Sequence, residues 1–132
     1  MAGSKIDKEI VLNTKNEIGV LAKVFITLSN SRVNVEALCA FGEKEKGTFL
    51  IYTFDQEKAI KVLLKEGYDV NTEEVVVATL ANRVGAAEEM TNKIAKARVN
   101  VNYCYGSTGD GKHTLFIIST ENNPKVLKAL KS

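Results

Sequence analysis

The stretch Arg32-Val-Asn-Val35 decides how this chain is interpreted, because it returns as Arg98-Val-Asn-Val101. The offset is 66 residues (98 − 32), and the same shift carries Asn16 onto Asn82 without a gap. Self-similarity at a fixed period indicates a repeated structural unit. The 132 residues therefore predict two very small copies rather than one ordinary domain.

Each copy changes its hydrophobic period in the same order. A short run rich in β-branched residues, typical of a strand, precedes apolar residues at helical spacing. Two extended runs then flank a turn rich in glycine and charge, and a second helical stripe follows. These elements fall at residues 9–13, 18–28, 33–41, 48–54 and 60–64, and again at residues 74–80, 84–94, 99–106, 114–120 and 126–130.

The order strand, helix, strand, strand, helix is most of a ferredoxin-like unit, and residues 68–70 supply a last strand to the first copy. The second copy ends at Ser132, before an equivalent strand. Either its sheet has three strands, or residues 5–7, the other domain or a second chain cover the open edge. We expect an α+β fold of two tandem ferredoxin-like (βαββαβ) domains, at residues 6–70 and 71–132, with antiparallel sheets and helices on one face.

The third strand of each copy, at residues 49–54 and 115–118, is apolar on both alternating faces. Helices cover only one face of such a sheet, so the other face is expected to be buried against a second sheet, within the chain or across a dimer. Units of about 60 residues are also marginally stable alone. We therefore expect packed tandem units that form a homodimer.

Composition excludes several classes of function. A formal charge of +2, spread evenly, does not indicate a nucleic-acid partner. No apolar run approaches the roughly 18 residues that cross a bilayer, and the N-terminus has no signal-peptide pattern, so we expect a cytoplasmic protein without membrane contact. Cys39 and Cys104 lie in apolar stretches without metal-ligand spacing, which predicts two reduced, buried thiols and no metal or cofactor.

Two other functions find little support. His113 is the single histidine and has no nucleophile near it in sequence, so we predict no catalytic residues and no enzyme activity. Tyr103 and Tyr105 alternate on one strand, as the stacking residues of an RNA-binding sheet do. However, residues 114–120 lack the interleaved basic and aromatic residues of the RNA-recognition signature.

The stretch Asn16-Glu-Ile-Gly-Val-Leu21, followed after a helix by Arg32-Val-Asn-Val35, resembles the ACT domain. In that family an acidic residue or asparagine, a variable residue, usually a proline and then a glycine lead into the first helix. The resemblance covers residues 8–131 and is closest to stand-alone proteins made of two ACT units. Ile18 and Val84 stand where the proline is usual, which makes the loop less preorganised without removing a binding group.

The resemblance implies a regulatory module that binds a small molecule, usually an amino acid, in the cleft between paired ACT units. In such sites the loop from strand one to helix one faces the start of strand two of the neighbouring unit. We expect the ligand-binding residues to be Asn16, Glu17, Ile18, Gly19, Val20, Leu21 and Asn34 in the first copy and Asn82, Arg83, Val84, Gly85, Ala86 and Asn100 in the second.

The chemistry of these residue types fits a zwitterion. A loop that opens a helix offers free N–H groups and a favourable dipole to a carboxylate. A glycine in that loop lets the backbone approach the ligand, and an asparagine amide both donates and accepts hydrogen bonds.

Purely structural roles stay open for the same residues. The two loop asparagines are good N-caps of the first helix, and the two loop glycines suit close packing of helix on sheet. Asn34 and Asn100 are equally suited to local bonds that shape the entry to strand two.

The alternative to a sensor is an interaction module, or a regulatory subunit that acts on a partner enzyme without its own ligand. The missing prolines favour it, as do differences between the copies, such as Leu21 against Ala87 and Glu17 against Arg83. The sequence favours the sensor, which shifts an equilibrium of a partner only through different affinities for its two states.

Overall fold

The structure is a computed structural model that describes residues 3–132, and it divides the chain into two units. The first unit is Glu9–Glu73, and the second unit joins residues 3–8 to residues 74–132. The expected boundary at residues 70 and 71 thus lies three residues before the observed one. Residues 6–8, expected in the first copy, belong to the second unit.

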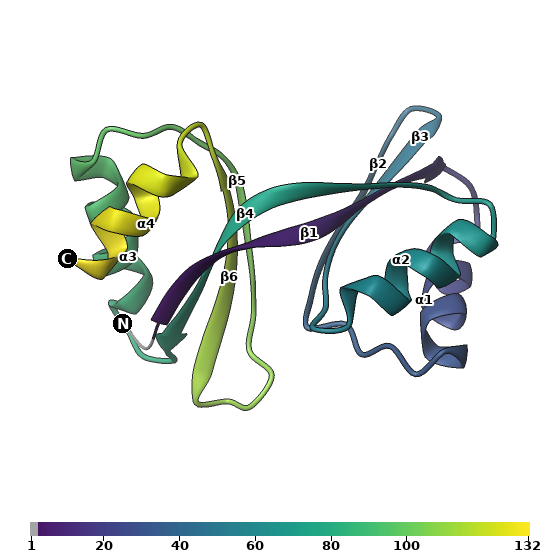
Figure 1. Cartoon of the computed structure of the whole chain (residues 1–132), viewed down its shortest axis with the longest axis horizontal. Coiled ribbons are helices and arrows are strands. Elements are labelled where there is room, and N and C mark those ends of the chain that lie inside the picture. The colour runs from purple at the N-terminus through teal and green to yellow at the C-terminus, as the bar shows by residue number, and fades with distance from the viewer. Residues whose placement is uncertain (1–2) are drawn as a thin grey trace. The chain divides into compact units, whose positions relative to one another are not determined.

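The first unit has the expected order of elements. They are residues 9–15 of β1 (Gly3–Lys15), α1 (Val20–Asn30), β2 (Ala37–Glu43), β3 (Lys46–Tyr52), α2 (Gln56–Lys65) and the first residues of β4 (Asp69–Ala81). Its strand order is β2-β3-β1-β4, and β3 pairs antiparallel with both β1 and β2. The helices α1 and α2 pack against each other (Figure 1). This is the ferredoxin-like arrangement that the sequence predicts.

The second unit repeats this arrangement. The remainder of β4 is followed by α3 (Ala86–Lys96), β5 (Val101–Ser107), β6 (His113–Thr120) and α4 (Asn123–Lys131), and α3 packs against α4. Its strand order is β1-β4-β6-β5, so residues 3–8 of β1 stand in the place of the missing last strand. Ile6 packs against the core of this unit. Of the three candidates for covering the open edge, the N-terminal segment is therefore the one found.

Each unit has its own core between its helices and one face of its sheet. In the first unit the buried cluster is Ile10, Leu12, Val24, Leu28, Val33, Phe49, Ile51, Ala59 and Leu63. In the second unit it is Val76, Ala78, Leu80, Ala86, Met90, Ile94, Ile118, Val126 and Leu130. Val24 and Leu28 occupy the same places in α1 as Met90 and Ile94 in α3, which accounts for the repeated helical spacing.

The opposite face of each third strand is buried as well. Leu50 and Ile117, which alternate with the core residues Ile51 and Ile118, are 5% and 0% exposed. This confirms that neither face of these strands is left to solvent.

The helical spacing was only partly a guide to burial. Ile18 and Val84 precede their helices and are fully exposed, and Leu21 and Phe25 lie on the exposed side of α1. The prediction that they join the buried stripe was wrong, because apolar periodicity marks an apolar face without saying what covers it.

The first helix of each unit ends at an arginine with left-handed backbone. Arg32 and Arg98 have φ values of 59° and 58°. After α1, the amides of Arg32 and Val33 donate to the carbonyls of Ser29 and Leu28, which is the Schellman pattern that satisfies the last carbonyls of a helix. Both arginines are exposed, as expected for solvated residues at a helix end.

The cysteines differ from the expectation of two buried thiols. Cys39 is half-buried and Cys104 is exposed on β5, and neither forms a disulfide. Cys104 lies on an end strand, so only one neighbouring strand covers it. Partial desolvation still raises the pKa of its thiol, which keeps the thiol neutral near pH 7. Within residues 3–132 there is no group of potential metal ligands and no helix that could span a membrane.

Candidate ligand site

The loop between β1 and α1 turns through a glycine in left-handed conformation. Gly19 is the N-cap of α1 with φ 85°, and Gly85 is the N-cap of α3 with φ 91°. A Cβ built on Gly19 would meet nothing within 4 Å, so the glycine is required by its backbone angle and not by close packing. No side chain caps either helix, which leaves the first-turn amides open to a ligand.

The loop asparagines fix this loop to the hairpin turn of the same unit. The side-chain amide of Asn16 donates to the carbonyl of Lys44 over 3.0 Å, and its backbone amide donates to the carbonyl of Glu45. Its side chain lies where a Cβ on Gly42 would stand, 2.5 Å away, so only glycine admits it there. The interpretation of Asn16 as an N-cap was wrong, because its partner lies 28 residues away.

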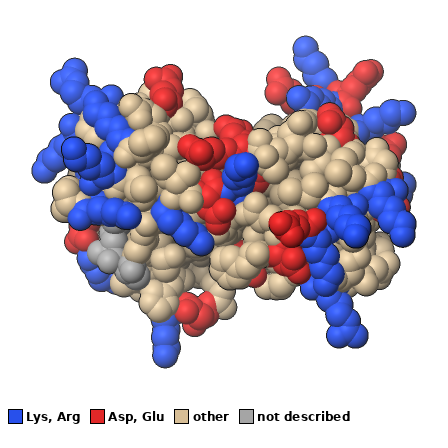
Figure 2. Space-filling view, in the orientation of Figure 1, with Lys and Arg blue, Asp and Glu red and all other residues tan. Residues whose placement is uncertain are grey.

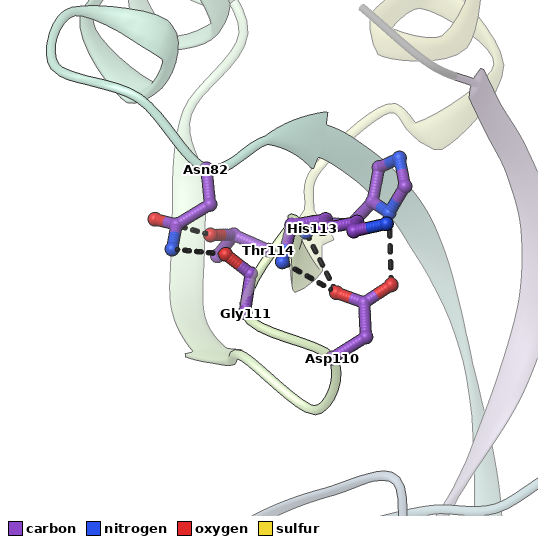
Figure 3. A network of polar contacts seen from close by, with 6 residues as sticks. Asn82, Asp110, Gly111, His113 and Thr114 are labelled. Atoms are coloured by element: carbon purple, nitrogen blue, oxygen red, sulfur yellow. Dashed lines mark hydrogen bonds and ion pairs between the residues drawn. The ribbon is translucent and has the colours of Figure 1, made fainter.

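Asn82 makes the equivalent contacts in the second unit, where Figure 3 shows the network. Its side-chain amide donates to the carbonyl of Gly111 over 3.0 Å, and its backbone amide donates to the carbonyl of Lys112. It is not an N-cap either. The repeated asparagine thus has one structural role in both copies, namely joining the loop to the hairpin turn.

A hollow of about 990 Å³ opens beside the loop of the first unit. Three turns of that unit surround it: the β1–α1 loop, the β2–β3 hairpin turn and the α2–β4 turn. The lining residues are Asn13, Thr14, Lys15, Glu17, Val20, Lys23, Glu43, Lys44, Glu45, Lys46, Glu66, Gly67, Tyr68 and Asp69. Of the predicted first-copy site residues, Glu17 and Val20 are in this set.

The lining carries both signs of charge, with four lysines and five acidic residues. Tyr68 is half-buried among them, and burial, followed by the negative charges of Glu66 and Glu17, raises the pKa of its hydroxyl. The hydroxyl therefore stays a hydrogen-bond donor at neutral pH. A surface that mixes ammonium, carboxylate and hydroxyl groups is chemically suited to a zwitterionic ligand.

Charges at the loop are reversed between the copies. Glu17 and Lys23 of the first unit correspond to Arg83 and Glu89 of the second by the shift of 66. The guanidinium of Arg83 contacts the carboxylate of Glu89 at 2.7 Å, and this contact holds the pKa of Glu89 below its usual range. Within the described chain, no such ion pair forms between Glu17 and Lys23. The second loop is thus closed by its own ion pair, and the first loop keeps its charges available.

Asn34 lies at the other end of α1 from this hollow. It lines a second hollow of about 440 Å³ with Phe25, Leu28, Ser29, Arg32, Val33 and Val35. Because α1 has 11 residues at about 1.5 Å each, its two ends are about 16 Å apart. One amino acid does not reach both the loop and Asn34 of the same unit.

Both strand asparagines also make local bonds. The Asn34 amide donates to the Glu36 carboxylate over 2.7 Å, and the Asn100 amide lies 3.5 Å from the carboxylate of Glu121. The structural role left open for these residues is therefore present. Their side chains are exposed, so it does not exclude contact with a ligand.

Sequence reasoning missed Tyr68 and the hairpin residues 43–46 as parts of the site. Residues 43–46 are a run of alternating charges, which is typical of any exposed turn and carries no sign of a site. Only the long-range bonds of Asn16 show that this turn belongs beside the loop.

The hairpin turn of the second unit is held by Asp110. One carboxylate oxygen accepts from the amides of Lys112 and His113, each over 2.8 Å, and the other lies 2.9 Å from Nδ1 of His113 (Figure 3). The His113 side chain, then its amide and that of Lys112, lower the pKa of Asp110 to about 2 from an ordinary 3.8. The bonds that Asp110 adds to the turn are fully present above about pH 3.8 and are lost as the pH falls through about 2.

Replacing His113 with alanine is expected to raise the pKa of Asp110 toward 3.8, because the largest cause of its depression is removed. The measurement is an NMR titration of the Asp110 carboxyl carbon in the two proteins. Thr114→Ala serves as the control, since Thr114 contacts Asn82 and has no bond to Asp110. A pKa that stays at about 2 in His113→Ala would mean that the two backbone amides suffice.

The family model described as an ACT domain pair matches residues 6–130. The chain therefore belongs to the ACT domain family, with two such domains in tandem, as the motif resemblance indicated. No curated protein matches the sequence.

Solved structures show the same fold at low sequence identity. A protein from Bacteroides thetaiotaomicron is 24% identical, with a TM-score of 0.86 over 97% of this chain and 88% of the other. The ligand-free regulatory subunit of aspartate kinase from Thermus thermophilus is 18% identical, with a TM-score of 0.69 over 98% and 95%. A putative C-terminal regulatory domain of aspartate kinase from Porphyromonas gingivalis is 15% identical, with a TM-score of 0.55 over 98% and 94%.

Proposed function

We propose that this protein is a non-catalytic regulatory sensor that binds an amino acid at the β1–α1 loop of its first unit. One observation carries the proposal: this loop opens on a hollow with unpaired charges of both signs, whereas the matching loop of the second unit is closed by Arg83 and Glu89. Membership of the ACT family and the regulatory proteins among its structural neighbours support it.

The ligand's carboxylate is placed at the open N-terminus of α1, where amides near Gly19 and the dipole favour an anion. Its ammonium group is placed near Glu17, and Tyr68 borders the space for the side chain. Since Asn34 of the same unit is too far away, the contact expected from a strand-two asparagine has to come from another ACT unit. The remaining predicted residues of the second copy are proposed as a weaker site or none.

Occupancy is proposed to act through a partner enzyme by stabilising one of two states of the assembly. The proposal also includes a cytoplasmic location and no nucleic-acid ligand. Acidic and basic side chains are interspersed on the face shown in Figure 2, which is in line with the small net charge.

The test is a thermal-melt screen against the twenty amino acids. A ligand at about 100 times its dissociation constant stabilises the state that binds it by about 2.7 kcal/mol, which amounts to several degrees for small domains. We expect Glu17→Gln to remove the shift and Arg83→Gln, the same change of charged group at the matching position of the second copy, to leave it. The assignment to the first unit fails if Arg83→Gln removes the shift instead.

The ligand-free interaction module is the second candidate. It is favoured by Ile18, a large apolar residue that is fully exposed in the loop itself. Under this function none of the twenty amino acids moves the melting temperature, whereas Ile18→Asp abolishes capture of a partner protein.

A further inference from the structure

The exposed side of α1 is apolar. Leu21, Phe25 and Ile26 are 49%, 36% and 57% exposed, and none belongs to the core cluster of the first unit. Leu21 and Phe25 are one helical turn apart and Ile26 adjoins Phe25, so the three form one strip. Lys23 is the only charged residue of the helix.

The corresponding side of α3 is not apolar. The shift of 66 carries these three residues onto Ala87, Thr91 and Asn92. The buried residues of the two helices correspond, as described above, so folding of the unit does not require the apolar strip. Its presence on α1 alone indicates a contact that only the first unit makes.

The end strands differ in the same sense. β2 is the end strand of the first unit, and its pairing with β3 is regular from Ala37 to Glu43. β5 is the end strand of the second unit, and its pairing with β6 is irregular between Val101 and Tyr103. A bulge is a common way to stop an edge from pairing with another chain, and a regular edge remains able to pair.

We propose that the strip on α1 and the free edge of β2 together form the interface with a second copy of this chain. The hollow lined by Phe25, Leu28, Val33 and Val35 connects the strip to the residues that lead into β2, so the two surfaces are continuous. The helix and the strand comprise 11 and 7 residues, close to the roughly 20 residues per partner of a stable interface.

A second copy fits this surface better than an unlike partner. A two-fold interface brings the same patch of both subunits together, so it has to complement itself. An apolar strip with one lysine does so without strong repulsion, and an edge strand pairs with its own copy in antiparallel register. The strip offers no cluster of one charge that would select an acidic or basic partner. This proposal does not depend on the ligand proposed above.

The experiment is sedimentation equilibrium of the full chain and four variants. We expect the wild type to have twice the chain mass of 14.4 kDa. Phe25→Asp and Ile26→Asp place a carboxylate in the interface and are expected to weaken the dimer at least about 30-fold. Thr91→Asp and Asn92→Asp, the same changes at the matching positions of α3, are expected to leave it intact.

Circular dichroism identifies any variant that fails to fold. If Phe25→Asp is unfolded, Ile26→Asp decides, because Ile26 is more exposed and lies outside the core. A wild type that is monomeric throughout would overturn the proposal. So would α1 variants that stay dimeric, or α3 variants that dissociate as readily as the α1 variants. Because no ligand is present, none of these results bears on amino-acid binding.

Discussion

Removing residues 1–8 is expected to destabilise the second unit by about 3 kcal/mol or more. Residues 3–8 form the strand beside β4, so their loss exposes the edge of β4 and uncovers the core at Ile6. Burial of an apolar side chain is worth about 1.5–3 kcal/mol when complete, and each backbone hydrogen bond adds about 0.5–1.5 kcal/mol. The entropy that the released segment regains offsets part of the loss.

Hydrogen exchange measures this effect with an internal reference. Amides of β6 and α4 are expected to lose protection in the shortened chain, while those of α2 and β3 keep theirs. Lys5→Ala is the matched substitution, because Lys5 is exposed and its contact with Asp7, at 3.5 Å, is a surface ion pair of little worth. Unchanged protection of β6 after the deletion would contradict the role given to this strand.

Asn123→Ala is expected to lower the free energy of unfolding of the second unit by about 3 kcal/mol. The Asn123 side chain is buried, and its carbonyl oxygen accepts from the amide and the hydroxyl of Thr120 at 3.2 and 2.7 Å. Its amide donates to the carbonyl of Glu74 over 3.0 Å. Alanine leaves these groups without a partner, and each buried polar group left unsatisfied costs about 1–3 kcal/mol.

The neighbouring asparagine provides the control. Asn122 is the N-cap of α4, exposed, and accepts one hydrogen bond from the amide of Lys125. Asn122→Ala is therefore expected to cost about 1 kcal/mol. The chain has no tryptophan, so urea unfolding is best followed by circular dichroism. Equal losses for the two variants would show that the buried bonds of Asn123 contribute no more than a surface cap.

The repeat made most of the fold predictable. A single register of 66 residues fixes the order of elements in both copies, and the turn at Gly19 and Gly85 follows from a residue type that accepts positive φ. Residues 3–8 were harder to place, because Ile6 is the one apolar residue among them. Nothing in so short a segment distinguishes a strand from a tail.

The site was less predictable than the fold. Asn16 has the composition of an N-cap, yet its amide is used 28 residues away, and propensity says nothing of partners at that distance. Tyr68 reaches the site only because the α2–β4 turn brings it there. The apolar spacing of α1 likewise merged buried Val24 and Leu28 with exposed Phe25, because core and interface residues have the same chemistry.

The second unit is discontinuous in the chain, and this has a consequence for folding during synthesis. Residues 3–8 leave the ribosome first, but the strand beside them begins only after the whole of Glu9–Glu73 has been made. The first unit is continuous and has all its strands by then. The earliest segment of the protein is thus expected to find its place among the last, and a contact that spans so much sequence is slow to form. A circular permutant that carries residues 3–8 after Ser132 would make this contact local and is expected to fold faster.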